Sequence, residues 1–296
     1  VVEHAAVDAG EIAVVPGFQG VTPDGKITTL GRGGSDTSAV AVAAALSCPC
    51  DIYTDVDGVY TTDPRIESRA RRLNKVSFEE MLEMASLGAK VLQTRSVELA
   101  MAKQVPVRVL SSFIEPDESG QMPDKGGTLI CDEEEIVEKR IVSGVTMSRD
   151  EARITLLGLS DRVDAPADVF TRLAEANVNV DMIVQSQART ANTVNLTFTT
   201  GRRDAVRAAD IMKAAQADLA FEEIRVDEDV AKVSVVGVGM RSHAGVAQTM
   251  FKALADKGVK FQAISTSEIK ISVLIDAAYA ELAVRALHSA YGLDAV

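Results

Sequence analysis

The sequence predicts an α/β fold that ends in two copies of a ferredoxin-like module, on three observations. A glycine-rich loop opens an alanine-rich helix in residues 31–46, between two β-prone segments. An internal repeat begins after residue 150. Aromatic residues make up 4% of the chain and Trp is absent, so aliphatic side chains must fill the interior. Such cores suit layers of helices on sheets.

The first part of the chain predicts a βαβ-like unit. Residues 12–18 (IAVVPGF) predict a buried strand that ends at a Pro-Gly turn, and residues 27–30 a short β segment. The glycine loop follows, then a helix over 38–46 and a strand over 51–56.

A capping box marks the next helix, because Ser77 is followed three residues later by Glu80. Gly88 stands where this helix should end. Residues 96–104 predict a further helix and residues 105–110 a strand. The Pro-, Gly- and Asp-rich segment 117–127 predicts a loop, and a domain boundary is expected near 131–140.

The repeat predicts tandem modules, each with the order strand, helix, strand, strand, helix. The aligned segments are 154–159 with 233–238, 170–174 with 251–255, and 177–183 with 258–264; the later strands are 194–199 and 269–275, and the second helices 204–217 and 277–288.

Charge and composition exclude several classes of protein. The net charge is −12 and the longest basic cluster, within residues 69–75, is short, so nucleic acid is not expected as a partner. The longest apolar run, 39–46, falls short of the roughly 20 residues that cross a bilayer, so no membrane span is expected, nor is a signal peptide. Three cysteines without a framework indicate reduced thiols in the cytoplasm.

Two segments could carry chemistry. Residues 31–36 (GRGGSD) combine close-approaching backbone amides, a helix N-terminus and Arg32, which together favour a phosphate or carboxylate; an ordinary capped turn is the alternative. Residues 54–65 follow a predicted strand, where ligands bind in open α/β sheets. Their carboxylates could hold magnesium through water, or the segment could be a polar turn.

Three ordered motifs and the repeat resemble the aspartate kinases of the amino-acid kinase superfamily. The motifs are GRGGSDTSA at 31–39, YTDVDGVYTTDPR at 53–65 and GAKV at 88–91, and STSEI at 265–269 matches the second of the family's two ACT domains. The resemblance implies the C-terminal half of an amino-acid-kinase α/β sandwich, followed by two ferredoxin-like (βαββαβ) ACT domains. The implied division is kinase domain 1–130, linker 131–145, first ACT domain 146–226 and second ACT domain 227–296.

The resemblance also implies a reaction. The γ-phosphoryl group of ATP, bound with Mg²⁺, passes to the side-chain carboxylate of L-aspartate, giving 4-phospho-L-aspartate, the first step toward lysine, threonine and methionine. No residue of this chain is assigned as a metal ligand. The matching positions are Asp36 and Arg32 as catalytic residues, Arg32, Gly33, Gly34 and Ser35 for aspartate, and Thr54, Asp55, Tyr60, Arg65, Lys90 and Val91 for the nucleotide.

The ACT domains imply feedback control by lysine, threonine or both, bound where chains pair in a homodimer or larger assembly. The matching positions are Asp161, Asp164, Ala165, Asn179, Val180, Asp181 and Gln185 in the first copy, and Lys260, Phe261, Thr266, Ser267 and Glu268 in the second. Asp161 and Glu268 are expected to anchor a cationic amino group, whereas Lys260 would repel one.

One departure from the family pattern concerns activity. The family's first strand carries a Lys-Phe-Gly-Gly-Thr-Ser segment with the catalytic lysine, and nothing like it stands here; the chain also opens with Val1 rather than Met. We therefore expect that upstream sequence is missing and that the chain alone is inactive. A regulatory amino-acid-binding subunit is the alternative; a glutamate or uridylate kinase would lack tandem ACT domains.

Overall fold

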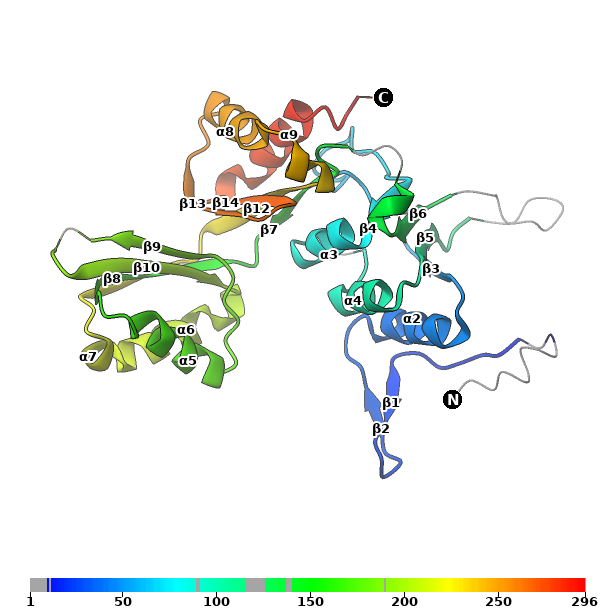
Figure 1. Ribbon diagram of the computed structural model, residues 1–296, viewed down its shortest axis with the longest axis horizontal. Helices are drawn as coiled ribbons and strands as arrows, with labels where there is room; N and C mark the ends of the chain where they lie inside the picture. Colours follow the sequence, from blue (N-terminus) through cyan, green and yellow to red (C-terminus); the bar gives the residue numbers. More distant parts are fainter. Residues whose placement is uncertain are drawn as a thin grey trace.

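The computed structural model describes residues 10, 12–88, 91–114, 126–136, 140–188 and 190–295. These residues form three bodies, each with its own four-stranded sheet, and a two-stranded hairpin (Figure 1). Within the described residues, every helix is too short or too polar to span a lipid bilayer.

The first body is an α/β layer whose sheet has the strand order β3-β5-β6-β4. Its elements are β3 (Cys50–Thr54), β4 (Lys75–Ser77), β5 (Val107–Ser111), β6 (Thr128–Cys131), α2 (Gly34–Leu46), α3 (Phe78–Ser86), α4 (Thr94–Lys103) and the 3₁₀ turn η1 (Glu133–Glu135). β3 runs parallel to β5, and β4 parallel to β6. The three helices and the sheet share one apolar core, as predicted for aliphatic layers.

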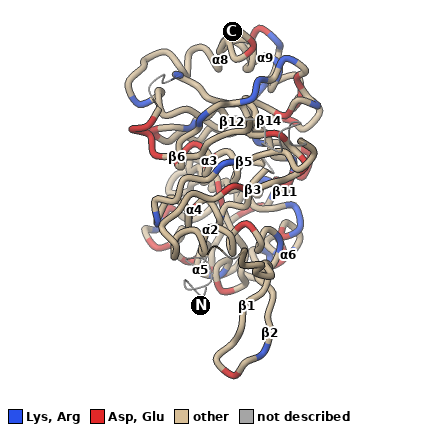
Figure 2. The backbone as a smooth tube through the Cα atoms, turned by 90° about the vertical axis from the view of Figure 1, so that its right-hand side faces the viewer, with Lys and Arg blue, Asp and Glu red and all other residues tan. Residues whose placement is uncertain are grey.

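The predicted strand over 12–18 is wrong. Residues 12–17 have no regular structure, and β1 (Gln19–Val21) pairs instead with β2 (Ile27–Thr29) in a hairpin that projects from the body (Figures 1 and 2). Pro16 cannot donate a backbone hydrogen bond and Phe18 has a positive φ of 69°. Ile12 is 92% exposed, so no sheet covers this segment.

The first repeat forms an antiparallel sheet with the order β11-β8-β10-β9, with its helices on one face (Figure 1). Its elements are β8 (Ala152–Ser160), α5 (Ala165–Glu175), β9 (Ile183–Gln187), β10 (Thr193–Thr200), α6 (Arg202–Ala214), α7 (Gln216–Leu219) and β11 (Glu223–Asp227). The helix predicted over 204–217 is split here between α6 and α7. Phe198 is fully buried in the core and lies edge-on to Phe170.

The second repeat builds the same sheet, with the order β13-β14-β12-β7. Its elements are β12 (Val230–Val236), η2 (Val238–Ser242), α8 (Val246–Asp256), β13 (Phe261–Thr266), β14 (Lys270–Asp276), η3 (Ala277–Tyr279) and α9 (Ala280–Ala290). The outer strand β7 (Gly144–Ser148) comes from before the first repeat and pairs antiparallel with β12. The repeat pattern did not predict this strand.

The second repeat is attached to the first body through buried polar contacts. Thr61, which is fully buried, accepts a backbone hydrogen bond from Val145 on β7 (2.8 Å). The hydroxyl of Thr61 lies 2.8 Å from Nε2 of His288 on α9, and His288 is also fully buried. Nearby, Arg69 binds both Glu67 (3.0 Å) and Asp294 (2.6 Å).

This attachment makes stability depend on pH. Burial lowers the pKa of His288, against the attraction of Glu67 and Asp294. As pH falls, the unfolded chain therefore binds the proton first, so stability present above about pH 6.5 is lost as pH falls through the folded pKa. We expect the unfolding free energy to fall with a slope of at most about 1.4 kcal/mol per pH unit relative to His288→Gln.

Urea unfolding at pH 7.5, 6.5, 5.5 and 5.0 measures this difference. His243→Gln is the matched control, because His243 is exposed, and this variant should follow the wild-type profile. Parallel profiles for the wild type and His288→Gln would contradict the prediction. The low pKa of Glu67, about 2, which its hydrogen bonds with Arg69 produce, keeps that carboxyl from titrating in the same range.

Candidate active site

The glycine loop sets up the start of α2 as predicted. Gly31 and Gly33 both have left-handed backbones, with φ of 78° and 72°. Gly33 is the N-cap, and no side chain caps the helix. A Cβ on Gly33 would lie 1.7 Å from Cγ of Gln93, so a larger residue would collide there. The backbone N–H of Gly34 donates to the carbonyl of Gly31 (3.0 Å), so the next amides of the first turn, those of Ser35 and Asp36, are the ones that an anion could bind.

A pocket of about 340 Å³ opens beside this loop. It is lined by Arg32, Gly33, Asp36, Ala85, Val91, Leu92, Gln93 and Thr94. Among the described residues, no carboxylate forms an ion pair with the exposed Arg32. The pocket thus joins a cation and a helix N-terminus on one side to residues 91–94 on the other.

Asp36 is the acidic residue of the pocket. It lies in the first turn of α2 and is half-buried. Burial raises the pKa of its carboxyl above the ordinary value. A desolvated carboxylate favours a nearby cation, because the charged form lacks full hydration. The position suits a carboxylate that orients a cationic group, in line with the catalytic role that the resemblance implies for Asp36.

The residues predicted from the first and third motifs lie at or beside the pocket, whereas those of the second motif do not. Arg32, Gly33, Asp36 and Val91 line the pocket, and Gly34 and Ser35 continue α2 beside it. Lys90 lies outside the described residues. Gln93 and Thr94 line the pocket but were not predicted. Gln93 is the N-cap of α4 and Thr94 its first residue, and this position shortly after the third motif is the feature that could have indicated them.

The second motif does not line this pocket. Thr54 ends β3 and hydrogen-bonds to Asp55 (3.1 Å). Tyr60 donates its hydroxyl to Asp57 (3.0 Å), which also pairs with Arg72 (3.2 Å).

Arg65, also in this motif, makes a forked pair with Asp63 at 2.7 Å while its side chain is 88% exposed. The described residues show no group of three or more acidic, His or Cys side chains placed to hold a metal.

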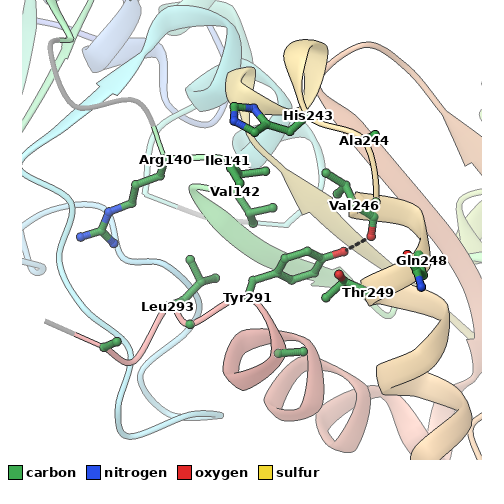
Figure 3. Close-up of a pocket in the computed structure, with 14 residues that line it drawn as sticks. Arg140, Ile141, Val142, His243, Ala244, Val246, Gln248, Thr249, Tyr291 and Leu293 are labelled. Atoms are coloured by element: carbon green, nitrogen blue, oxygen red, sulfur yellow. Dashed lines mark hydrogen bonds between the residues drawn. The ribbon is translucent and has the colours of Figure 1, made fainter.

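A larger hollow, of about 560 Å³, lies elsewhere in the second repeat, between the start of α8 and the end of α9 (Figure 3). Arg140 and His243 lie at its border, and Tyr291 donates its hydroxyl to the carbonyl of Val246 (2.7 Å). It contains none of the predicted site residues. We therefore take the smaller pocket, which holds the glycine motif, as the candidate active site.

In the first repeat, the predicted effector residues gather around the loops that precede α5 and β9. Asp164 is the N-cap of α5 and Ala165 is its first, buried residue. Asn179 accepts a hydrogen bond from Thr200 (2.7 Å), and Gln185 lies on the edge strand β9. Asp161 and Val180 complete the set, with Asp161 exposed.

Asp181 has an unexpected partner. The ammonium group of Lys232, on β12 of the second repeat, contacts both Asp181 and Glu151 (2.7 Å from the latter). Lys232 and Glu151 are each 6% exposed. Burial alone would lower the pKa of Lys232, but the two carboxylates outweigh it and raise that pKa. The ion triad therefore joins the two repeats beside an expected effector residue.

In the second repeat, the predicted residues follow β13. Phe261 packs on Phe251 with ring centroids 5.2 Å apart, but the residue is 44% exposed and so remains accessible to a ligand. Ser267 donates its backbone N–H to Lys270 (2.8 Å), closing the turn after Thr266. Glu268 lies 3.4 Å from Arg241, with 83% of its side chain exposed. Lys260 is exposed just before the strand.

Two protein-family models match the chain, one over the first body and one over the second repeat. Residues 3–111 match the amino acid kinase family, and residues 233–291 match an ACT domain. The fold and the site thus define an amino acid kinase that carries regulatory ACT modules, which confirms the predicted fold class.

Similar proteins of known family show which kind of amino acid kinase the chain resembles. The chain is 55% identical over 295 residues to an aspartokinase of Pseudomonas aeruginosa, covering 99% of this chain and 69% of that protein. It superposes on E. coli aspartokinase III in complex with aspartate and ADP with a TM-score of 0.79 and 31% identity. The complex of that enzyme with lysine and aspartate gives 0.74 and 30%. The chain belongs to the aspartokinase family, as the motifs predicted.

The chain is shorter than these proteins. The superposition on the aspartate and ADP complex includes 97% of this chain but 62% of the E. coli chain. For the lysine complex, the shares are 98% of this chain and 62% of the E. coli chain.

Proposed function

We propose that this chain is the larger part of an aspartate kinase, which transfers the γ-phosphoryl group of MgATP to the side-chain carboxylate of L-aspartate. The observation that carries the proposal is the pocket that places Arg32 and the open N-terminus of α2 opposite residues 91–94. Aspartate and ADP in the related E. coli enzyme support the same pair of ligands.

In this proposal, the positively charged side of the pocket binds the carboxylate of aspartate, and the acidic residue binds a cation. Arg32 and the first amides of α2 bind a carboxylate of aspartate, because a guanidinium grips carboxylates at two points. Asp36 orients a cationic group next to the phosphates. Phosphoryl transfer needs positioning and charge neutralisation more than covalent chemistry. Mg²⁺ would arrive with the nucleotide phosphates and neutralise their charge.

In this proposal, the nucleotide is bound by residues of both the second motif, 53–65, and the third motif, 88–91. We propose contacts from Thr54, Asp55, Tyr60, Arg65 and Val91, with Lys90 near the phosphates. Within the part of the chain that the structure describes, the guanidinium of Arg65 is held by an exposed ion pair with Asp63. Exposed pairs contribute roughly 0–1 kcal/mol, so a phosphate can replace that partner.

We propose that the two repeats are ACT domains, divided at about residue 227, which bind lysine, threonine or both and pair in a homodimer or larger assembly. The lysine complex of the E. coli relative supports an amino-acid effector. Asp161 and Glu268 remain the anchors for an amino group, because both are exposed whereas Asp181 is held by Lys232.

The reaction is tested on the chain completed at its N-terminus with the matching segment of the Pseudomonas aeruginosa relative. Formation of ADP should depend on L-aspartate, on Mg²⁺ and on ATP, and an acyl phosphate should be trapped by hydroxylamine. Formation of ADP that is the same with and without aspartate would reject aspartate as the acceptor.

The regulatory part is tested on the chain itself by thermal unfolding with L-lysine, L-threonine or both. A ligand present at 100 times its dissociation constant adds about 2.7 kcal/mol when it binds only the folded state. A saturable rise in Tm identifies the effector. No rise with either amino acid, nor with methionine or isoleucine, would count against amino-acid sensing by this chain.

A further inference from the structure

Glu80, at the start of α3, is a buried carboxylate with hydrogen-bond donors on both oxygens. The residue is 2% exposed. Oε2 accepts from the backbone N–H of Ser77 and from its hydroxyl, each at 3.1 Å. Oε1 accepts from the hydroxyl of Ser143 (2.6 Å) and from the backbone N–H of Val238 (2.9 Å). The first oxygen belongs to the predicted capping box, but the second does not.

The partners of the second oxygen belong to another body of the protein. Ser143 immediately precedes β7, and Val238 follows β12. These two strands are neighbours in the second ACT sheet. Among the described residues, no Lys or Arg forms an ion pair with Glu80, so hydrogen-bond donors alone stabilise the buried carboxylate. One side chain therefore binds both strand ends of that sheet to α3.

Further contacts follow along the same helix. Glu83, one turn later, pairs with Lys270 on β14 at 2.9 Å. After the helix, Gly88 has a φ of 111°, and a Cβ there would lie 2.4 Å from the carbonyl oxygen of Met147 on β7. The helix and the turn after it thus lie against one end of the second ACT sheet and its edge strand β7; Figure 1 shows α3 beside these strands.

The other end of α3 reaches the candidate active site. Ala85, in its last turn, lines the pocket. Residues 91–94, which follow shortly after the helix, form a wall of the same pocket as Arg32 and Asp36, next to the glycine loop, since Gln93 packs against Gly33. A shift of α3 along or across the ACT sheet would therefore move this wall relative to the glycine loop.

We propose that Glu80 is a positioning residue: its carboxylate fixes α3 on the second ACT sheet and thereby sets the place of residues 91–94 in the active-site pocket. The proposal rests on the proposed function only in treating this pocket as the active site. A change in the second ACT sheet reaches the pocket through this carboxylate.

Glu80→Gln tests the proposal on the chain itself. Glutamine keeps the shape but turns one acceptor oxygen into an N–H₂ donor, which then faces other donors. Hydrogen exchange measured by mass spectrometry should be about tenfold faster at residues 91–94, since local opening sets these rates. Protection of β10 in the first ACT domain should not change. Glu98→Gln, the same substitution at an exposed position of α4, should match the wild type.

One further variant keeps the test decisive. Ser143→Ala removes one donor from outside the helix and should give the same local pattern, about threefold, even if Glu80→Gln fails to fold. A uniform rise of exchange across all bodies, or unchanged exchange at 91–94, would overturn the proposal. Because the readout is exchange, it stands apart from whether the pocket phosphorylates aspartate.

A kinetic readout separates positioning from simple loss of fold. In the completed kinase, Glu80→Gln should raise KM for ATP about fivefold and change kcat less than about twofold, because a displaced wall weakens binding. An equal fractional loss of activity at all ATP concentrations, with KM unchanged, would indicate partial unfolding and would overturn the positioning role.

Discussion

Arg32→Ala should lower kcat/KM for aspartate by about 100-fold in the completed kinase, because charge-assisted hydrogen bonds to a carboxylate contribute roughly 1.5–3 kcal/mol. Arg32 lines the pocket beside the open end of α2, and no described carboxylate forms an ion pair with it. The measurement is initial rate against aspartate concentration at saturating MgATP.

Arg32→Lys separates charge from geometry. A lysine keeps the charge but binds a carboxylate at one point, so an intermediate loss of about tenfold is expected. Arg203→Ala, at an exposed position in the first turn of α6, controls for the loss of one positive charge and should leave kcat/KM unchanged. A loss for Arg32→Ala below about threefold would place the acceptor carboxylate elsewhere.

Lys232→Ala should reduce the free energy of unfolding by about 3–5 kcal/mol, since it leaves a buried carboxylate without its partner. Glu151 has little exposure and pairs with Lys232 at 2.7 Å. Burial raises the pKa of Glu151 even with Lys232 present, so the carboxylate is costly to leave alone. Chemical denaturation at pH 7.5 measures the loss.

The double variant Lys232→Met/Glu151→Leu is the informative comparison. Removing both charges should recover most of the stability, because buried ion pairs often contribute little beyond their own desolvation. Lys213→Ala, in an exposed pair with Asp210, should change stability by less than about 0.5 kcal/mol. A loss for Lys232→Ala as small as that of Lys213→Ala would show that water reaches the triad.

The sequence predicted those elements whose determinants are local. α2 follows directly from the glycine loop, and both halves of the capping box of α3 are formed. The two repeated sheets were predicted from the internal repeat, whose aligned segments form equivalent strands and helices in the two modules. The strand over 12–18 was wrong because apolar residues form a strand only beside a partner, and none of the described strands pairs with this segment.

The sequence predicted part of the lining of the pocket, and the binding and catalytic roles of these residues stay predictions. The glycine loop and Val91 meet in one pocket, as the order of motifs implied. Gln93 was not predicted, because its side chain packs where a Cβ of residue 33 would lie. Gly33 has no Cβ, and this contact joins segments that are distant in the sequence. The partners of Asp181 and Glu80 likewise come from strands far along the chain, and local patterns carry no information about such pairs.

The position of β7 determines where the two ACT domains can be truncated and in which order they can fold during synthesis. The first ACT domain is an insertion inside the second, because β7 precedes it and β12 follows it in one sheet. The ends of the insertion lie together, with Arg153 on β8 bonded to Asp227 on β11 (3.1 Å), a geometry that tolerates excision.

During synthesis, the nascent β7 must wait for the whole inserted domain before β12 emerges to pair with it. The inserted domain can fold in that interval, so the outer module closes last. A fragment that begins at Val230 would leave β12 as an uncovered edge prone to pair with other chains, whereas one that begins before Gly144 carries its own protection.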